Sequence, residues 1–280
     1  EPLLDKDGNP VTATVTFTPK ASYGSADLTF EFDARDLIGQ EVVAFESLSR
    51  DGIEVAVHAD INDEGQTVEI VSPKIGTTAV DGIDGDKTVI ADTEAVVIDT
   101  VSYENVMVNH EYSTHGELMK KVYGEDGTVS VEPVLDKEGN PVVADTDFTP
   151  VDSYGTVDLS LTFDATGFAD GDELVVFESL YRDGVELTNH KDANDEGQTV
   201  VIKHPVIGTT ATDGFDGDKT VVADTQASVK DVVEYSDVIV GKEYQVTGTL
   251  QVKNVAEDGT VTGEPLLDKD GNPVTATVTF

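Results

Sequence analysis

The chain has 280 residues, which is enough for about two domains of ordinary size. Its 17 basic and 56 acidic residues give a net charge of −39. This charge excludes nucleic acid as a natural partner, because phosphate binding requires clustered Lys and Arg, and it disfavours contact with anionic membranes. The chain has no Cys, so no disulfide can stabilise it.

Internal repeats run through the whole chain. The phrase EPLLDKDGNPVTATVTF occupies residues 1–17 and returns unchanged at residues 264–280. Two shorter phrases return after 132 residues, namely IGTT at 75–78 and 207–210, and an acidic phrase ending in DEGQTV at 58–68 and 190–200. The chain therefore contains tandem units of about 132 residues.

The phase of the repeats predicts three segments. Residues 1–72 are the C-terminal part of one unit, residues 73–204 form a complete unit, and residues 205–280 are the N-terminal part of a following unit. The first residues fall in mid-pattern, so we expect the chain to be a window from a longer protein.

Within the complete unit, polar and apolar residues alternate with a period of two, which predicts strands over 94–103, 157–163, 173–181 and 198–203. Turn sequences such as DGIDGD, GEDG and NDEG separate the strands, and no stretch has helical periodicity. Eight or nine short strands in roughly 130 residues predict an all-β fold of tandem immunoglobulin-like antiparallel β-sandwich repeats.

Two of the predicted strands carry a carboxyl group in an otherwise apolar row. Asp99 alternates with valines, and Glu178 alternates with Leu and Val; the other units repeat the pattern at Asp231 and Glu46. Burial of an unpaired carboxylate costs several kcal/mol, so its recurrence suggests a purpose. Alternation alone cannot show which row of each strand faces the core, because both rows are apolar.

Three further polar residues recur at one repeat position each. His58 corresponds to His190, and Gln66 corresponds to Gln198. Gln198 alternates with apolar residues in the closing strand, and Thr77 does so in the opening strand. The sequence therefore predicts a buried amide and a buried hydroxyl on the last and first strands of the complete unit.

The phrases VVAFESL, VVFESLY, IGTTATD, GDKTVVADT and HxDxNDEGQTV together resemble the VaFE repeats of Gram-positive surface proteins. They are similar to the Thr–Gln ester-bond domains of cell-wall-anchored adhesins. That resemblance covers the whole chain, and it implies an intramolecular ester between a Thr on the first strand and a Gln on the last.

Carried over to this sequence, the resemblance implies a cross-link between Thr77 and Gln198 that Asp99, Glu178 and His190 assist. Thr78 is the alternative nucleophile, and the alternation favours Thr77. In the incomplete units, the corresponding cross-link residues are Thr209, with Thr210 as its alternative, and Gln66, and the assisting residues are Asp231, Glu46 and His58. The reaction is a single turnover, so the resemblance implies no enzyme in the usual sense and no cofactor.

The resemblance also implies a structural stalk or fibre role on the cell surface, with the secretion and wall-anchoring signals outside this window. The expected partners are neighbouring repeats of the same protein, or separate copies placed head to tail. Gln66 and Thr209 then find their partners in the preceding and following units.

The acidic loops allow a second interpretation, in which the chain is a ligand- or calcium-binding adhesive module without a cross-link. The phrase from Asp60 imitates the start of an EF-hand loop, but its twelfth position is Val71, where a Glu is required. A looser calcium site at DGIDGD or DKDGNP is the remaining form of this alternative, against the simpler interpretation that these are solvated turns.

Overall fold

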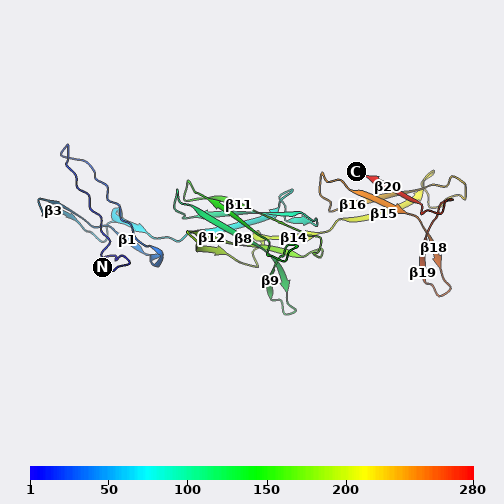
Figure 1. Cartoon of the computed structure of the whole chain (residues 1–280), viewed down its shortest axis with the longest axis horizontal. Helices are drawn as coiled ribbons and strands as arrows, with labels where there is room; N and C mark the ends of the chain where they lie inside the picture. Colours follow the sequence, from blue (N-terminus) through cyan, green and yellow to red (C-terminus); the bar gives the residue numbers. More distant parts are fainter. The chain divides into compact units, whose positions relative to one another are not determined.

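The computed structural model describes all 280 residues, and it consists of β-strands with three short 3₁₀ turns and no α-helix (Figure 1). The all-β prediction is therefore confirmed. None of the helical turns has the length and apolar character that a membrane-crossing helix needs.

The elements follow one another along the chain in this order: η1 (Arg35–Leu37), β1 (Glu41–Val43), β2 (Glu46–Arg50), β3 (Ile53–His58), η2 (Glu64–Gln66), β4 (Thr67–Glu69), β5 (Lys74–Asp81), β6 (Thr88–Ile90), β7 (Ala95–Glu104), β8 (Tyr112–Tyr123), β9 (Val129–Pro133), β10 (Val143–Phe148), β11 (Tyr154–Phe163), β12 (Glu173–Arg182), β13 (Val185–His190), η3 (Glu196–Gln198), β14 (Thr199–Lys203), β15 (Val206–Asp213), β16 (Val229–Ser236), β17 (Gln245–Thr249), β18 (Gln251–Val255), β19 (Val261–Pro265) and β20 (Thr275–Thr279).

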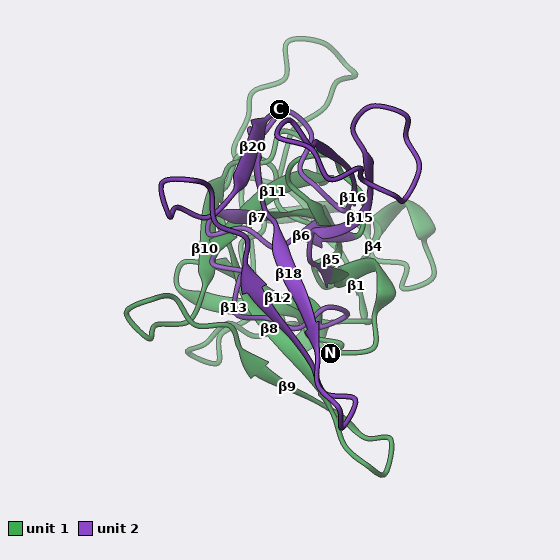
Figure 2. Ribbon diagram, turned by 90° about the vertical axis from the view of Figure 1, so that its right-hand side faces the viewer, with its two compact units in different colours: residues 1–87, 96–163, 173–201 green, residues 88–95, 164–172, 202–280 purple.

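The chain divides into two compact units (Figure 2). The first comprises residues 1–87, 96–163 and 173–201, and the second comprises residues 88–95, 164–172 and 202–280. All five candidate site residues of the central repeat lie in the first unit.

In the first unit, a larger antiparallel sheet has the order β10-β8-β12-β14, with β13 paired to β12 and β9 paired to β8. Across β12, Glu178 lies opposite His190 on one side and opposite Gly116 on the other. A Cβ at Gly116 would approach Leu159 Cδ1 to 2.7 Å, so a larger residue beside this carboxyl-bearing position would force the Leu159 side chain to shift.

A second antiparallel sheet of the first unit has the order β11-β7-β5. Its strand β5 contacts β12 and β13 of the larger sheet. The register between β5 and β7 places Thr77 opposite Val101 and Ala79 opposite Asp99. The two sheets thus bring the opening strand of the repeat against the strands that carry the acidic and histidine residues.

Apolar side chains from both sheets form the core of the first unit. Val97 and Val101 of β7 and Leu174 and Val176 of β12 have no exposed surface. Each such side chain contributes about 1.5–3 kcal/mol when it is fully buried. One row of β12 is fully buried apart from the strand's last residue, and the other alternates between buried and half-buried residues, so neither face of the strand is open to solvent.

An aromatic cluster closes one part of this core. The ring of Phe148 stacks on Tyr103 with a centroid distance of 4.8 Å and on Tyr112 with a distance of 5.8 Å. Tyr112 also accepts a hydrogen bond from the Met107 amide at 2.8 Å. In a chain without Cys or Trp, this cluster supplies large buried surfaces that join β7, β8 and β10.

The segments on either side of the central repeat keep the strand pairs of the central repeat. Glu46 pairs with His58 across β2 and β3, as Glu178 pairs with His190. Thr209 pairs with Val233 across β15 and β16, which is the register of Thr77 and Val101 shifted by one repeat. The repeat therefore determines local pairing in each segment separately.

The strands expected over 94–103 and 173–181 are observed at Ala95–Glu104 and Glu173–Arg182. The strand expected from residue 198 begins one residue later, at Thr199, because residues 196–198 form the η3 turn instead. The repeat contains the ten strands β5 to β14 and not eight or nine, because the chain also forms the short strands β6 and β9.

Candidate functional site

Thr77 and Thr78 face opposite sides of β5. The Thr77 hydroxyl oxygen is buried and has no hydrogen-bond partner, whereas Thr78 is exposed. Strand geometry explains the difference, because neighbouring side chains point to opposite faces. Thr77 shares its face with the fully buried Ala79, so the hydroxyl is directed toward the core.

Asp99 lies on β7, directly opposite Ala79 of β5. Its side chain is fully buried, and neither carboxyl oxygen has a hydrogen-bond partner of ordinary geometry. The apolar row that contains Asp99 therefore faces the core and not the solvent, which resolves the choice that alternation left open. Burial raises the pKa of Asp99 to about 6, although Glu178, His190 and Lys87 act in the opposite direction.

Glu178 is the second fully buried carboxyl group of the site. Burial, followed by the neighbouring charge of Asp99, raises its pKa to about 10. The nearby Thr77 hydroxyl lowers the pKa of both carboxyl groups. Two buried carboxyl groups that act on each other do not both ionise readily, and Glu178, whose pKa is raised more, is the one that keeps its proton more strongly.

Gln198 is the last residue of the η3 turn and is fully buried. Its amide nitrogen donates hydrogen bonds to the Val176 carbonyl at 2.9 Å, to the Glu178 carboxyl group and to the His190 carbonyl at 3.4 Å. Its amide oxygen is buried without a partner. The amide is therefore held by its nitrogen, and its carbonyl oxygen has no donor.

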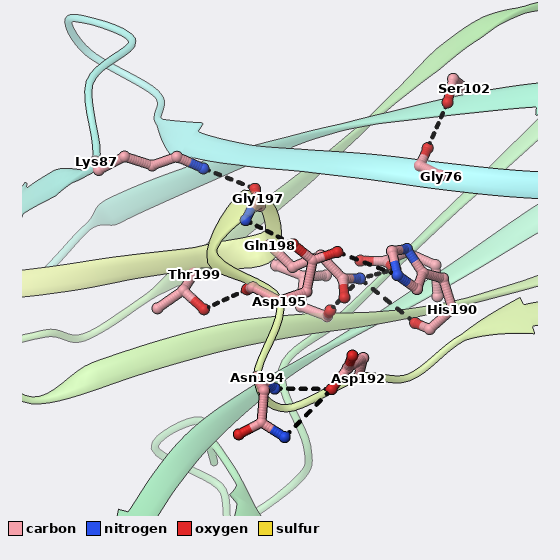
Figure 3. A network of polar contacts seen from close by, with 12 residues as sticks. Gly76, Lys87, Ser102, His190, Asp192, Asn194, Asp195, Gly197, Gln198 and Thr199 are labelled. Carbon is pink, nitrogen blue, oxygen red and sulfur yellow. Dashed lines mark hydrogen bonds and ion pairs between the residues drawn. The ribbon is translucent and has the colours of Figure 1, made fainter.

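The η3 turn is built by Asp195, whose carboxylate accepts a hydrogen bond from the Gly197 amide at 2.7 Å. The Asp195 carbonyl accepts a bond from the Thr199 hydroxyl at 2.7 Å (Figure 3). Asp side chains stabilise such turns by accepting bonds from the backbone two residues onward. This local capping removes Gln198 from the strand that alternation predicted, while the side chain still enters the core.

His190 ends β13 and lies opposite Glu178 in the sheet. Its Nε2 atom is 3.1 Å from Asp195 Oδ2, while its Nδ1 atom is buried and has no partner (Figure 3). Asp195 thus fixes the ring through one nitrogen and leaves the other available for proton transfer. The sequence prediction did not include Asp195, although its recurrence as Asp63 was a visible signal.

The preceding segment repeats the Gln half of this arrangement. The Gln66 amide nitrogen donates to Glu46 Oε2 at 2.6 Å and to the Ala44 carbonyl at 2.7 Å. His58 Nε2 lies 3.0 Å from Asp63 Oδ2. Glu46, His58 and Gln66 therefore come together as their counterparts do, with no Thr strand in that segment.

The following segment repeats the Thr half. Thr209 and Thr210 lie on β15 and are exposed, and Asp231 lies on β16 and is also exposed. Asp231 is opposite Ala211 in the register that places Asp99 opposite Ala79. Their side chains lack the buried environment that the complete repeat provides.

Buried polar atoms without a partner are concentrated in these residues. Across the whole chain, such side-chain atoms are confined to Thr77, Asp99, Glu178, His190 and Gln198, together with the amide oxygen of Gln66. Each buried polar atom left unpaired costs about 1–3 kcal/mol, and native structures contain few of them. One buried site therefore contains a hydroxyl, two carboxyl groups, an imidazole and a carboxamide. These are the groups that acyl transfer needs.

The acidic loops close as turns through their own carboxylates. Asp81 Oδ2 accepts bonds from the amides of Ile83 at 2.9 Å and Asp84 at 3.2 Å. Asp5 Oδ1 accepts bonds from the amides of Asp7 and Asn9 in the same manner. No group of three or more His, Asp or Glu side chains in the structure is arranged to hold a metal ion.

Comparison with solved structures gives distant similarity. A bacterial adhesin from Mobiluncus mulieris containing intramolecular disulfide, isopeptide and ester bond cross-links aligns with a TM-score of 0.41 and 14% identity, over 69% of this chain and 93% of that one. BcpA, the major pilin subunit of Bacillus cereus, aligns with a TM-score of 0.30 and 14% identity, over 98% and 89%.

Comparison with curated protein sequences gives no match. A family model described as "T-Q ester bond containing domain" matches nearly the whole chain, at residues 2–70, 73–202 and 205–280.

Proposed function

The chain belongs to the family of T-Q ester bond containing domains, and we propose that its complete repeat forms an ester between Thr77 Oγ1 and Gln198 Cδ. The observation that carries the proposal is the confinement of the buried unpaired polar atoms to the reacting and assisting residues. A resting site with this many unpaired groups is expensive, and it is suited to a reaction that uses them.

The proposed reaction begins with proton removal from the Thr77 hydroxyl by Asp99, the carboxyl group that ionises first. Thr77 Oγ1 attacks Gln198 Cδ, and the protonated Glu178 donates to the oxyanion that develops on Gln198 Oε1. The Cδ–Nε2 bond then breaks, and Nε2 takes up the proton that left the hydroxyl. The products are one ester and one ammonia, so atoms and protons balance.

His190 serves in this proposal as the group that relays the proton to the leaving nitrogen. Its carbonyl accepts a bond from Gln198 Nε2, and its ring is held by Asp195 with Nδ1 unpartnered. An imidazole is suited to this task because its ordinary pKa lies near neutral pH. The reaction occurs once in each repeat, so the protein is its own substrate, in keeping with a family that is structural and not enzymatic.

The proposed architecture is a tandem array of immunoglobulin-like β-sandwich repeats of about 132 residues. In this chain, residues 73–204 form the complete repeat, residues 1–72 end a preceding one and residues 205–280 begin a following one. The three ranges of the family match and the repeated registers across β2–β3 and β15–β16 support these boundaries. Two contacting antiparallel sheets in the central repeat support the sandwich.

The proposed role is that of a stalk or fibre on a bacterial cell surface, anchored to the wall by a segment beyond this one. The resemblance of the sequence to VaFE repeats of Gram-positive surface proteins supports this location, and near-identical tandem units suit a spacer. An ester between the first and last strands would carry force from one end of a repeat to the other through covalent bonds. In a stalk without Cys, the ester would provide the covalent cross-link that a disulfide cannot form.

The proposed partners are neighbouring repeats. Gln66, already bonded to Glu46, would react with the Thr of a preceding repeat, and Thr209 with the Gln of a following one. In a continuous array those residues belong to the same chain, and separate copies placed head to tail would offer the same groups.

Intact-mass measurement of the purified chain tests the proposed bond. We expect a mass lower than that of the sequence by one ammonia for each ester, with tandem mass spectrometry joining the Thr77 peptide to the Gln198 peptide. Thr78→Ala is the matched control and should keep the loss. An unmodified mass in a well-folded chain would refute the proposal.

A further inference from the structure

Lys87 joins the two reacting segments of the central repeat. Its ammonium donates to the Ala79 carbonyl at 2.5 Å. It also donates to the Gly197 carbonyl at 2.7 Å (Figure 3). Ala79 lies two residues after Thr77 on β5, and Gly197 immediately precedes Gln198 in the η3 turn. One side chain therefore bonds to the backbone beside the hydroxyl and to the backbone beside the amide.

The two segments are in close contact where Lys87 binds them. A Cβ placed on Gly197 would lie 3.5 Å from the Thr77 carbonyl oxygen. The η3 turn is fixed on its other side by the Asp195 cap. Without the ammonium, two carbonyl groups at this contact would lose their shared donor, and the turn would be held to β5 by packing alone.

Lys87 also places a positive charge beside the acidic groups of the site. The charges of Asp99 and Asp195 act on its ammonium and favour its protonated form, against the effect of burial, which lowers the pKa of Lys87. In return, the ammonium favours the ionised form of Asp99. The other groups that act on Asp99 are Glu178 of β12, His190 of β13 and the Thr77 hydroxyl of β5.

The following repeat contains the same contact in a simpler setting. Lys219 stands at the position of Lys87, and its ammonium donates to the Ala211 carbonyl at 2.5 Å. Ala211 corresponds to Ala79, and the second unit has this Thr strand without a Gln-bearing turn of its own. The lysine thus binds the Thr-bearing strand even where no Gln-bearing turn is present. Its ammonium still has N–H groups that can donate to the carbonyl of such a turn.

From these contacts we propose that Lys87 is a positioning residue for ester formation, which holds the Gln-bearing turn on the Thr-bearing strand and places its positive charge near Asp99, the residue opposite Ala79 in the sheet. The inference rests on the proposed Thr77–Gln198 reaction. It assigns a function to Lys87 of the GDK phrase. Strand periodicity does not single out this residue, because it lies before the strand β6.

The test compares rates of cross-linking in the full chain. The parent, Lys87→Gln and Lys87→Arg are synthesised in a cell-free system buffered over a range of pH values, and samples are quenched in denaturing acid at intervals. Intact mass and the joined Thr77–Gln198 peptide measure the extent of reaction. Lys74→Gln removes an exposed charge from β5, the strand whose Ala79 carbonyl Lys87 binds, and is the matched control.

We expect Lys87→Gln to slow ester formation roughly a hundredfold, the loss that a misplacement of about 1 Å produces in a reacting pair. We also expect the rise of the rate with pH, which follows ionisation of Asp99, to move to higher pH, because a charge that favours the carboxylate is gone. Lys87→Arg should keep the position of this rise, since it keeps the charge, and should recover part of the rate.

A purely structural role for Lys87 predicts a different result. A slower reaction with an unmoved pH profile, or a Lys87→Gln rate equal to the parent rate, would overturn the inference. Gln198→Ala and the double variant Gln198→Ala/Lys87→Gln cannot cross-link, so their thermal melting compares the effect of Lys87 on folding alone. A double variant that fails to fold would show that Lys87 acts by stabilising the fold. A parent chain that forms no ester would refute the proposed function itself, which separates the two failures.

Discussion

Replacing Thr77 by Ala should remove the ester and reveal its contribution to stability. The bond would join residues that enclose a loop of about 120 residues, and closure of such a loop restricts the unfolded chain by roughly 5 kcal/mol in the treatment used for disulfides. The substitution also removes one methyl group, worth about 1 kcal/mol. The hydroxyl has no partner in the structure, so its loss breaks no existing hydrogen bond.

The sum of about 6 kcal/mol corresponds to a fall of roughly 20 °C in the melting temperature of a domain of this size. Differential scanning calorimetry measures the fall, and intact mass verifies that the ester is absent from Thr77→Ala and present in the parent. Thr78→Ala is the control, because its side chain is exposed on the opposite face of β5. Melting of Thr77→Ala within a few degrees of the parent would refute the reasoning, since the bond would then be absent or without energetic effect.

Three further predictions concern the proton transfers and the incomplete repeats. Glu178→Gln and His190→Ala should give folded chains that lack the mass loss of one ammonia, and complete cross-linking in both would remove these residues from the mechanism. The pKa of Glu178 is raised in the folded state from its ordinary value of 4.5 to about 10, so the folded state is favoured while this group is protonated. An uncross-linked chain should therefore lose stability as the pH rises from 4.5 toward 10. Glu178→Gln should flatten this dependence, which melting temperatures measured across pH would show. Concentrated samples of the chain should form covalent head-to-tail oligomers through Gln66 and Thr209, visible as a ladder on denaturing gels; a ladder that survives Gln66→Ala would contradict this pairing.

Much of the fold could be predicted from the sequence because its determinants are local. The period-two pattern located β7 and β12 to within one residue, and the recurring turn phrases separated the strands. The repeat located equivalent positions in three segments, and their strand registers agree. Recurrence of Asp99, Glu178, His190 and Gln198 indicated a site before any spatial relation was known, since similar polar residues in apolar rows are costly wherever they lie.

Only the tertiary structure decided which of those rows is covered. Alternation defines two faces of a strand and cannot tell which face meets the other sheet, so the burial of Asp99 followed from sheet stacking alone. The same stacking buried the Thr77 hydroxyl and left Thr78 in solvent.

Two contributors to the site, Asp195 and Lys87, lie outside any periodic pattern. Asp195 caps a 3₁₀ turn and also contacts His190, while Lys87 bonds to a carbonyl 110 residues away. Such contacts depend on where turns and strand ends meet after two sheets pack, and no rule of sequence spacing relates them. The sequence by itself therefore determined the strands, the repeat and the candidate site residues. The tertiary structure decided which of these groups are desolvated and which side chains contact them, because burial and contact between distant segments exist only in the packed fold.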